Sequence, residues 1–185
     1  RARWGVYFVL GNHERRVNSA RLRRMLGEAG LVDLGGRWRE TEIRGERVVL
    51  AGNEIPWFRP AADLQGAPRS SLCGGPFRIV LAHCPDQLAW ARREEADLLL
   101  VGHTHGGQVC LPGIGAIFSP CLQGVRYIRG TYAAPPTVMH VSQGISAELP
   151  FRFRCMPEAA LLTLHAAGGT ASSGPDRVGQ TVCCK

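Results

Sequence analysis

Three short apolar runs, each ending in a polar cluster that contains histidine, constrain the fold of this sequence most. They span residues 6–10, 77–82 and 97–101. Continuous runs rich in Val, Ile, Leu and Phe are typical of strands buried on both faces of a sheet. Open α/β sheets bind ligands just beyond the carboxyl ends of their strands. We therefore predict an α/β fold in which the three clusters meet at one sheet edge.

The segments between these runs carry weaker signals. Apolar residues at helical spacing between positions 22 and 29 predict a helix that Asn18 or Ser19 caps and Gly30 ends. A second helix is predicted over 85–95, which opens on proline, and a strand over 48–51. Residues 55–75 are expected to form a loop with a short helix, and 109–132 to be irregular. Strands of a second sheet are predicted at 137–141, 151–154 and 160–164.

Length and composition indicate one globular domain. The 185 residues are 45% hydrophobic and 20% charged, with no apolar run long enough to span a membrane. We place the domain at residues 1–165 and predict a disordered tail over 166–185, where Gly, Ala, Ser and Thr dominate. The seven cysteines include no C-x-x-C pair, which favours free thiols over a disulfide framework or a structural zinc module. We expect a monomer.

The basic charge of the chain is almost entirely arginine. The net charge is +7, and all but one of the 22 basic residues are arginine. Five of these arginines form a cluster between positions 15 and 24. This arginine cluster could attract an anionic substrate or an acidic membrane surface, or could form a solvated helix face. No base-reading or stacking motif indicates specific nucleic-acid binding. The cluster consists of Arg15, Arg16, Arg21, Arg23 and Arg24.

Four of the six histidines follow predicted strands and are candidates for a metal site. They are His13, His83, His103 and His105. Neutral imidazole is a common ligand of transition metals. An H-x-H pair in an extended loop points both rings to one side. We expect Thr104, between the pair, to support the loop.

The sequence blocks around these histidines resemble the calcineurin-like metallophosphoesterases. The blocks read G-N-H-E at 11–14, A-H-C-P-D at 82–86 and G-H-T-H-G-G-Q at 102–108. The last block is similar to the bacterial branch of YkuE-like phosphodiesterases and UDP-2,3-diacylglucosamine pyrophosphatase-like enzymes. The resemblance covers about residues 4–164. It implies two stacked mixed β-sheets flanked by helices, an αββα sandwich that is incomplete at its N-terminus.

The resemblance also implies a role for each residue. Asn12, His83 and His103 would bind the second of two divalent metal ions, and His105 would bind the first. The metals would be Mn²⁺, Fe or Zn²⁺. Asn12 and His13 would contact the substrate, and His13 would be the catalytic residue that protonates the leaving group. Glu14 is expected to stabilise its loop.

This chain departs from the family pattern at its start. The family has D-x-H and G-D-x-x-D blocks before G-N-H-E, and neither occurs here. Because a core strand follows Arg1 almost at once, we expect an upstream segment that could hold these blocks and a signal or anchor. On its own, this chain is expected to be inactive. A cytoplasmic or membrane-associated location is expected.

The predicted function is hydrolysis of a phosphodiester, pyrophosphate or phosphomonoester bond through a dinuclear metal centre. The substrate would be a phosphorylated small molecule or a lipid-linked compound, with peripheral membrane contact. Two alternatives stay open. One is an inactive fragment or a non-catalytic scaffold, and the other is a mononuclear zinc hydrolase that uses His83, His103 and His105.

Overall fold

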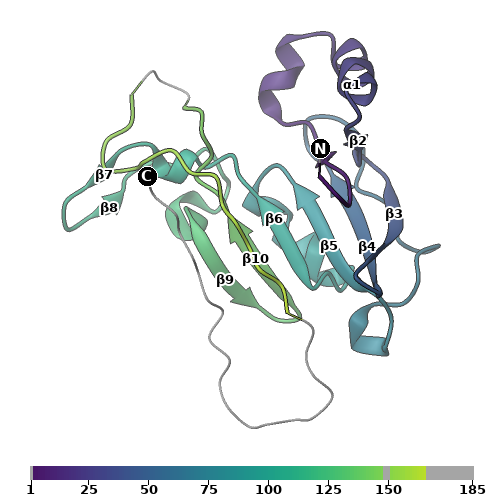
Figure 1. Ribbon diagram of the computed structural model, residues 1–185. Coiled ribbons are helices and arrows are strands. Elements are labelled where there is room, and N and C mark those ends of the chain that lie inside the picture. Colours follow the sequence, from purple (N-terminus) through teal and green to yellow (C-terminus); the bar gives the residue numbers. More distant parts are fainter. Residues whose placement is uncertain (1, 148–150, 166–185) are drawn as a thin grey trace, which may run out of the picture.

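A six-stranded mixed sheet forms the centre of the structure (Figure 1). The computed structural model of the protein describes residues 2–147 and 151–165. The four inner strands run parallel to one another, and an antiparallel strand closes each edge. The predicted α/β class is confirmed. In spatial order the strands are β3 (Trp38–Ile43), β4 (Glu46–Asn53), β5 (Phe77–Ala82), β6 (Leu98–Val101), β10 (Thr137–Val141) and β9 (Gly130–Ala134).

A second, smaller sheet packs on one face of the first. It consists of β1 (Tyr7–Phe8) and β2 (Val32–Asp33), which pair in parallel. Tyr7 and Val9 pack against a buried cluster that includes Leu34 from the β2 side and Val48 and Leu50 from β4. Two sheets therefore share a core, as in the expected sandwich.

Side chains along β5 point alternately to the two faces of the main sheet, and a separate hydrophobic core lies on each face. Val80 and Ala82 point to the face covered by α2 (Leu88–Arg93), where they join the larger buried cluster. Ile79 and Leu81 point to the opposite face and pack with the second sheet. Successive strand residues face opposite sides, so one run of apolar residues supplies both cores.

The helices predicted from the sequence are present in the structure. Helix α1 (Ser19–Glu28) begins after Asn18, whose Oδ1 accepts a hydrogen bond from the Arg21 amide at 3.0 Å. It ends before Gly30, which has a φ of 86°. The helix predicted over 85–95 is present as η3 (Pro85–Gln87) followed by α2. The short helix expected in the 55–75 loop is η2 (Ser71–Cys73).

Several sequence predictions differ from the structure. Residues 137–141 form β10, but this strand lies in the main sheet beside β6 and not in the second sheet. The predicted strands at 151–154 and 160–164 are wrong: of these residues, only Phe153 makes a β-bridge, to Val109. Apolar composition alone does not make a strand, because a strand also needs a partner with which it pairs over several residues. The predicted tail at 166–185 lies outside the described residues.

The stretch at 109–132, predicted to be irregular, contains short elements. β7 (Cys110–Leu111) and β8 (Gly115–Ala116) form an antiparallel hairpin, and η5 (Gly124–Tyr127) follows. The two-residue strands are too short to leave an alternating pattern in the sequence. In the part of the chain that the structure describes, no helix is long and apolar enough to cross a bilayer.

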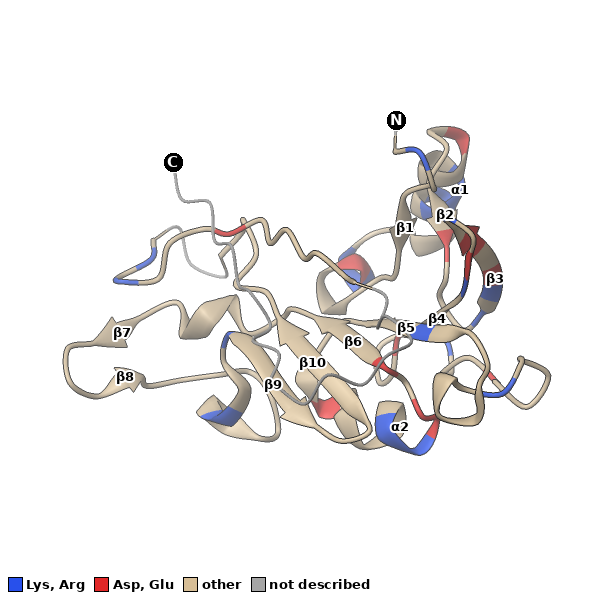
Figure 2. Cartoon of the chain, turned by 60° about the horizontal axis from the view of Figure 1, so that its bottom comes forward, with Lys and Arg blue, Asp and Glu red and all other residues tan. Residues whose placement is uncertain are grey.

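The arginine cluster in and before α1 is not a uniform solvated face (Figure 2). The Arg23 side chain is only 10% exposed and forms ion pairs with Asp33 and Glu54. Arg15, Arg21 and Arg24 are more exposed. Part of the cluster therefore serves the fold and is withdrawn from any anionic partner.

Candidate metal centre

Three donor atoms from distant parts of the chain converge at the carboxyl ends of β5 and β6. The Nε2 atom of His83 lies 2.8 Å from Oδ1 of Asn12 and 3.1 Å from Nδ1 of His103. The Gly102 amide donates to the His83 carbonyl at 3.1 Å, which ties the two strand ends together. The prediction that these residues share one edge of the sheet is confirmed.

Asn12 opens η1 (Asn12–Arg16), and the turn before it is built around a glycine. The Gly11 amide donates to Oε2 of Glu14 at 2.7 Å, so Glu14 stabilises the loop as expected. A Cβ atom at Gly11 would lie 2.3 Å from the His83 ring. Only glycine allows the backbone to pass this close to the imidazole.

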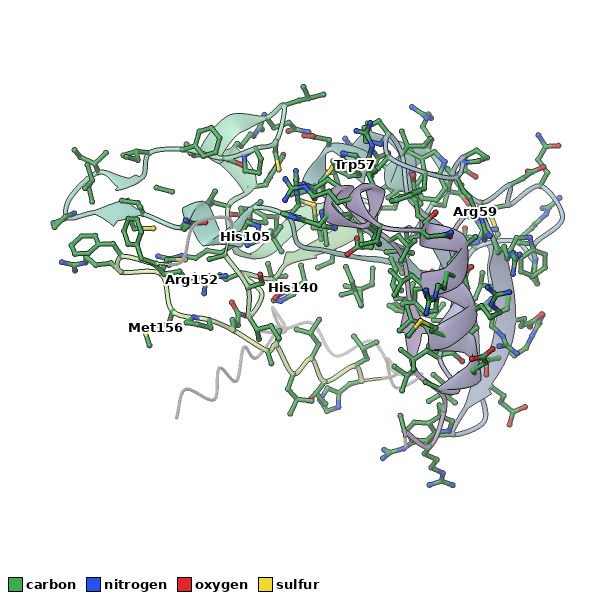
Figure 3. The ribbon with its side chains drawn as sticks, turned by 90° about the horizontal axis from the view of Figure 1, so that it is seen from above. Trp57, Arg59, His105, His140, Arg152 and Met156 are labelled. Carbon is green, nitrogen blue, oxygen red and sulfur yellow. The ribbon has the colours of Figure 1, made fainter. Side chains whose placement is uncertain are left out.

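An aromatic side chain covers the two converging imidazoles. The centroid of the Trp57 ring lies 5.0 Å from the centroid of the His83 ring and 5.0 Å from that of the His103 ring. Both contacts are edge-on. Figure 3 labels Trp57 above the sheet edge. Edge-to-face contact holds the orientation of both rings.

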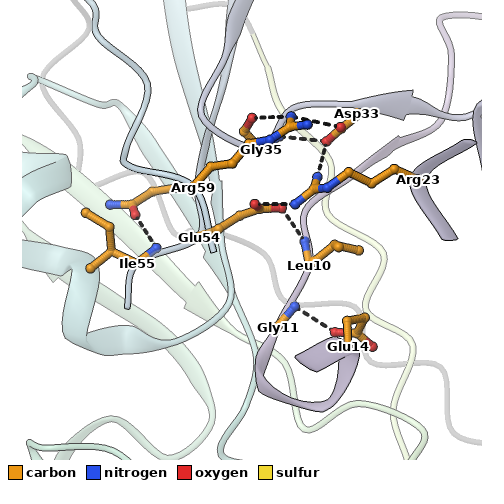
Figure 4. A network of polar contacts seen from close by, with 10 residues as sticks. Leu10, Gly11, Glu14, Arg23, Asp33, Gly35, Glu54, Ile55 and Arg59 are labelled. Carbon is orange, nitrogen blue, oxygen red and sulfur yellow. Dashed lines mark hydrogen bonds and ion pairs between the residues drawn. The ribbon is translucent and has the colours of Figure 1, made fainter. Parts of the chain in front are cut away.

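A buried ion-pair network supports the loop that carries Asn12 (Figure 4). Glu54 is fully buried just after β4, and its Oε1 accepts from the Leu10 amide at 2.7 Å. Its Oε2 lies 2.5 Å from Nη2 of Arg23. Arg23 also pairs with Asp33 at 2.6 Å, and Asp33 in turn pairs with Arg59 at 3.0 Å.

The network fixes the backbone immediately before the G-N-H-E block. A buried carboxylate is stable when cations and amides satisfy both of its oxygens, and Glu54 meets that condition. Helix α1, strand β2 and the end of β4 are thereby joined behind the candidate site.

The His83 imidazole is electrically neutral over most of the pH range. Burial, together with the positive charges that neighbouring histidines can carry, lowers its pKa to about 3. A neutral imidazole nitrogen is the form that binds a metal ion. These neighbours are His103, His13 and His105.

The loop after β6 holds His103 in an uncommon backbone conformation. His103 has a φ of 70° and His105 a φ of 50°. Such left-handed residues cluster at functional sites, where surrounding contacts hold them. Thr104 supplies one such contact, because its hydroxyl donates to the Ile128 carbonyl at 2.7 Å and accepts from the Gly106 amide at 3.3 Å. The predicted supporting role of Thr104 is confirmed.

His105 begins η4 (His105–Gly107) and is held by the segment after β10. Its Nδ1 is 3.0 Å from the Ser146 carbonyl oxygen, and Arg152 donates to the His105 carbonyl at 3.2 Å (Figure 3). Arg152 also bonds the carbonyls of Gln143 and Gly144, so it braces the loop against the segment after β10.

A cavity of about 270 Å³ opens in front of these loops. Asn12, His103 and His105 line one side, and Phe118 and Pro120 line another. Three of the predicted ligands, Asn12, His103 and His105, therefore line a single cavity.

Two bacterial proteins are similar to this chain over most of its length. The chain is 32% identical over 163 residues to phosphodiesterase YaeI of Escherichia coli (strain K12), which covers 86% of this chain and 58% of that protein. It is 31% identical over 167 residues to the uncharacterized metallophosphoesterase YkuE of Bacillus subtilis (strain 168), covering 88% of this chain and 57% of the relative. The chain is related to the calcineurin-like metallophosphoesterases.

A mammalian relative extends this set of metallophosphoesterases. The transmembrane protein with metallophosphoesterase domain of Bos taurus is 28% identical over 187 residues, covering 90% of this chain and 40% of that protein. The chain spans a little over half the length of the two bacterial relatives. No family model matches it, and no solved structure matches it.

A metallophosphoesterase uses divalent metal ions, and the donor set fits one such ion in part. Asn12, His83 and His103 offer one oxygen and two nitrogens, all neutral, which suit a transition metal. Within residues 2–147 and 151–165, no group of three His, Cys, Asp or Glu side chains is arranged to hold a metal.

The residues that support the candidate site are not among those predicted from the sequence. Glu54 and Trp57 follow the run at 48–51, which ends in G-N-E just as the other runs end in polar clusters. That repetition was a usable signal for Glu54. The pairing of Arg23 with Glu54 joins positions 31 residues apart, and no local pattern marks it.

Proposed function

We propose that this protein is a phosphodiesterase that hydrolyses its substrate at a dinuclear metal centre. The convergence of Asn12 Oδ1, His83 Nε2 and His103 Nδ1 is the observation that carries the proposal. A relative at 32% identity is named a phosphodiesterase, which favours a diester over a pyrophosphate or a monoester as the substrate.

In this proposal Asn12, His83 and His103 hold one metal ion, and His105 contributes to the other. Bound divalent ions supply Lewis-acid polarisation of the phosphate oxygens and lower the pKa of water. The protein's own residues do the positioning. Trp57 and Thr104 keep the ligand-bearing loops rigid, and the burial of His83 keeps its imidazole unprotonated.

His13 is the proposed general acid. It follows Asn12 in η1, is half-buried, and lies close enough to His83 for its charge to lower the pKa of that imidazole. A proton donated from the His13 ring to the departing alkoxide oxygen would prevent a poor leaving group from separating as an anion.

Metal content and leaving-group dependence together test this assignment. In a full-length protein, His13→Ala should leave metal content unchanged while the rate falls roughly 10²- to 10⁴-fold for an alkyl diester. The loss should be smaller for a nitrophenyl diester, because that leaving group needs little protonation. Metal content is measured by mass spectrometry of the purified variant.

His103→Ala is the matched comparison. It should reduce both metal content and rate for either leaving group. Loss of metal from His13→Ala, or an equal cost for both leaving groups, would show that His13 is a ligand or a positioning residue. A wild-type full-length protein without bound metal would support the scaffold alternative instead.

A further inference from the structure

The β7–β8 hairpin projects from the body of the molecule and exposes large apolar side chains (Figure 1). Ile114 at its turn is 73% exposed, and Phe118 just after β8 is 67% exposed. The sequence from 106 to 125 contains no Asp, Glu, Lys or Arg. Exposed apolar side chains gathered in this way mark an interaction surface.

A second segment enlarges this apolar surface. The Cys110 amide donates to the Phe153 carbonyl at 2.9 Å, and the Phe153 amide donates to the Gln108 carbonyl at 2.9 Å. These bonds hold residues 151–156 against the base of the hairpin, where Phe151 and Phe153 are also exposed. We call the exposed side chains of Ile114, Ile117, Phe118, Phe151 and Phe153 the hairpin surface.

The charge around the hairpin surface is predominantly positive. The described residues from 102 to 165 include four arginines and a single carboxylate, Glu158. Glu158 is engaged by the Gln143 side chain at 2.8 Å. Figure 2 shows basic residues on the segments that flank the hairpin, and Arg126 and Arg154 among them are exposed.

An exposed apolar tip with a basic surround fits an anionic lipid surface. Apolar side chains enter the boundary between headgroups and acyl chains, while arginines remain at the level of the lipid phosphates. A second copy of this chain fits less well, since a symmetric dimer would bring two arginine-rich surfaces together.

The hairpin surface is continuous with the candidate metal centre. Phe118 lines the same cavity as Asn12 and His103. A lipid whose acyl chains lay against the hairpin could therefore place its headgroup phosphate in front of these donors.

We propose that the hairpin surface docks on an anionic lipid bilayer and that the substrate is a phosphate ester in a lipid headgroup. The docking surface is independent of the catalytic proposal, whereas the substrate class rests on it. Membrane contact is thereby assigned to the hairpin surface and not to the arginine cluster of residues 15–24, in which Arg23 is held by Asp33 and Glu54.

Vesicle co-sedimentation of this chain tests the docking surface without any need for activity. The chain should bind phosphatidylcholine vesicles that contain phosphatidylglycerol more tightly than pure phosphatidylcholine vesicles. The double variant Ile114→Asp with Ile117→Asp should weaken binding at least about tenfold, because two apolar side chains no longer enter the bilayer. Neither residue lines the cavity.

Two further variants sharpen the result. Arg126→Gln and Arg154→Gln should each weaken binding about fivefold, and only to the anionic vesicles. Leu72→Asp, at an equally exposed position on η2, is the matched control and should bind like wild type. Circular dichroism checks that each variant is folded, and Ile114→Ser is the milder substitute if the double variant is not.

Several outcomes would overturn the docking proposal: no binding to anionic vesicles, equal binding by the double variant, or self-association that the double variant abolishes in the absence of vesicles. The substrate class is read separately from full-length protein. There the double variant should lose activity on phospholipid in vesicles but keep activity on a soluble nitrophenyl diester. Absence of both activities in wild type would refute the proposed function and leave the docking result standing.

Discussion

The half-buried imidazole of His83 links the acid stability of the fold to the candidate metal centre. In the unfolded chain a histidine has a pKa near 6.5, and burial lowers the pKa of folded His83 to about 3. Between these values the unfolded state binds one more proton than the folded state at this position. Stability is therefore present in full above about pH 6.5 and falls as the pH drops toward 3.

We expect the metal-free protein to lose up to about 1.4 kcal/mol of unfolding free energy per pH unit through His83 in this window. His83→Gln should flatten the pH dependence by about one proton. Urea titrations between pH 6.5 and 4, in the presence of a chelator, measure both slopes. Identical slopes for wild type and variant would contradict the assignment.

Glu54 is the side chain whose loss should disturb the loop before Asn12 most. Glu54→Gln removes the charge that pairs with Arg23 while preserving shape, and should cost about 3 kcal/mol because it leaves a buried cation with only Asp33 as partner. Glu40→Gln is the matched control, since its ion pair with Arg47 is solvent-exposed and should contribute little. Equal denaturation midpoints for the two variants would show that the network does not stabilise the fold.

Substitution by alanine should have opposite effects at two glycines, Gly11 before η1 and Gly27 in α1. Gly11→Ala places a Cβ 2.3 Å from the His83 ring, so it should displace the loop and lower metal affinity. Gly27→Ala, inside α1 and with nothing near its Cβ, should stabilise the protein by about 0.5–1 kcal/mol. Thermal melts and metal titrations distinguish them. A stabilising Gly11→Ala would contradict the described approach of loop and ring.

The elements that the sequence predicts well are those with a dense local signal. Strand β5 matches its predicted bounds, and α1 begins at its predicted cap, because a buried run and a capping residue are encoded within a few positions. The strand expected at 6–10 is reduced to Tyr7–Phe8, since the backbone leaves the sheet to reach Gly11 and Glu54. Strand β9 was missed because its neighbours along the chain are glycine and proline turns.

The histidines of the candidate site could also be predicted from local sequence signals, but the residues that support them could not. Histidines after apolar runs are visible in the sequence, and the structure brings His83 and His103 together. Trp57 and Arg152 act on the site through contacts with residues far away in the chain. Such contacts depend on how the elements pack, and no short pattern encodes them.

Local stability should vary across the whole molecule from the inner strands to the hairpin. β5 and β6 are hydrogen-bonded on both sides and buried, whereas β7 and β8 form a two-stranded sheet that Phe153 joins only at its base, and they are partly exposed. Amide hydrogen exchange followed by mass spectrometry should therefore be slowest in β5 and β6 and fastest in the hairpin. A hairpin protected as strongly as β5 would imply that another surface covers it in solution.

The ion pair between Arg23 and Glu54 also restricts how related sequences can diverge. Neither charge can be lost alone without stranding the other in the interior, and Asp33 shares the same guanidinium. Positions 23, 33 and 54 should therefore change together among homologous proteins, or not at all. Arg23 of the outer helix α1 would then share its sequence history with Glu54, whose carboxylate holds the backbone before Asn12.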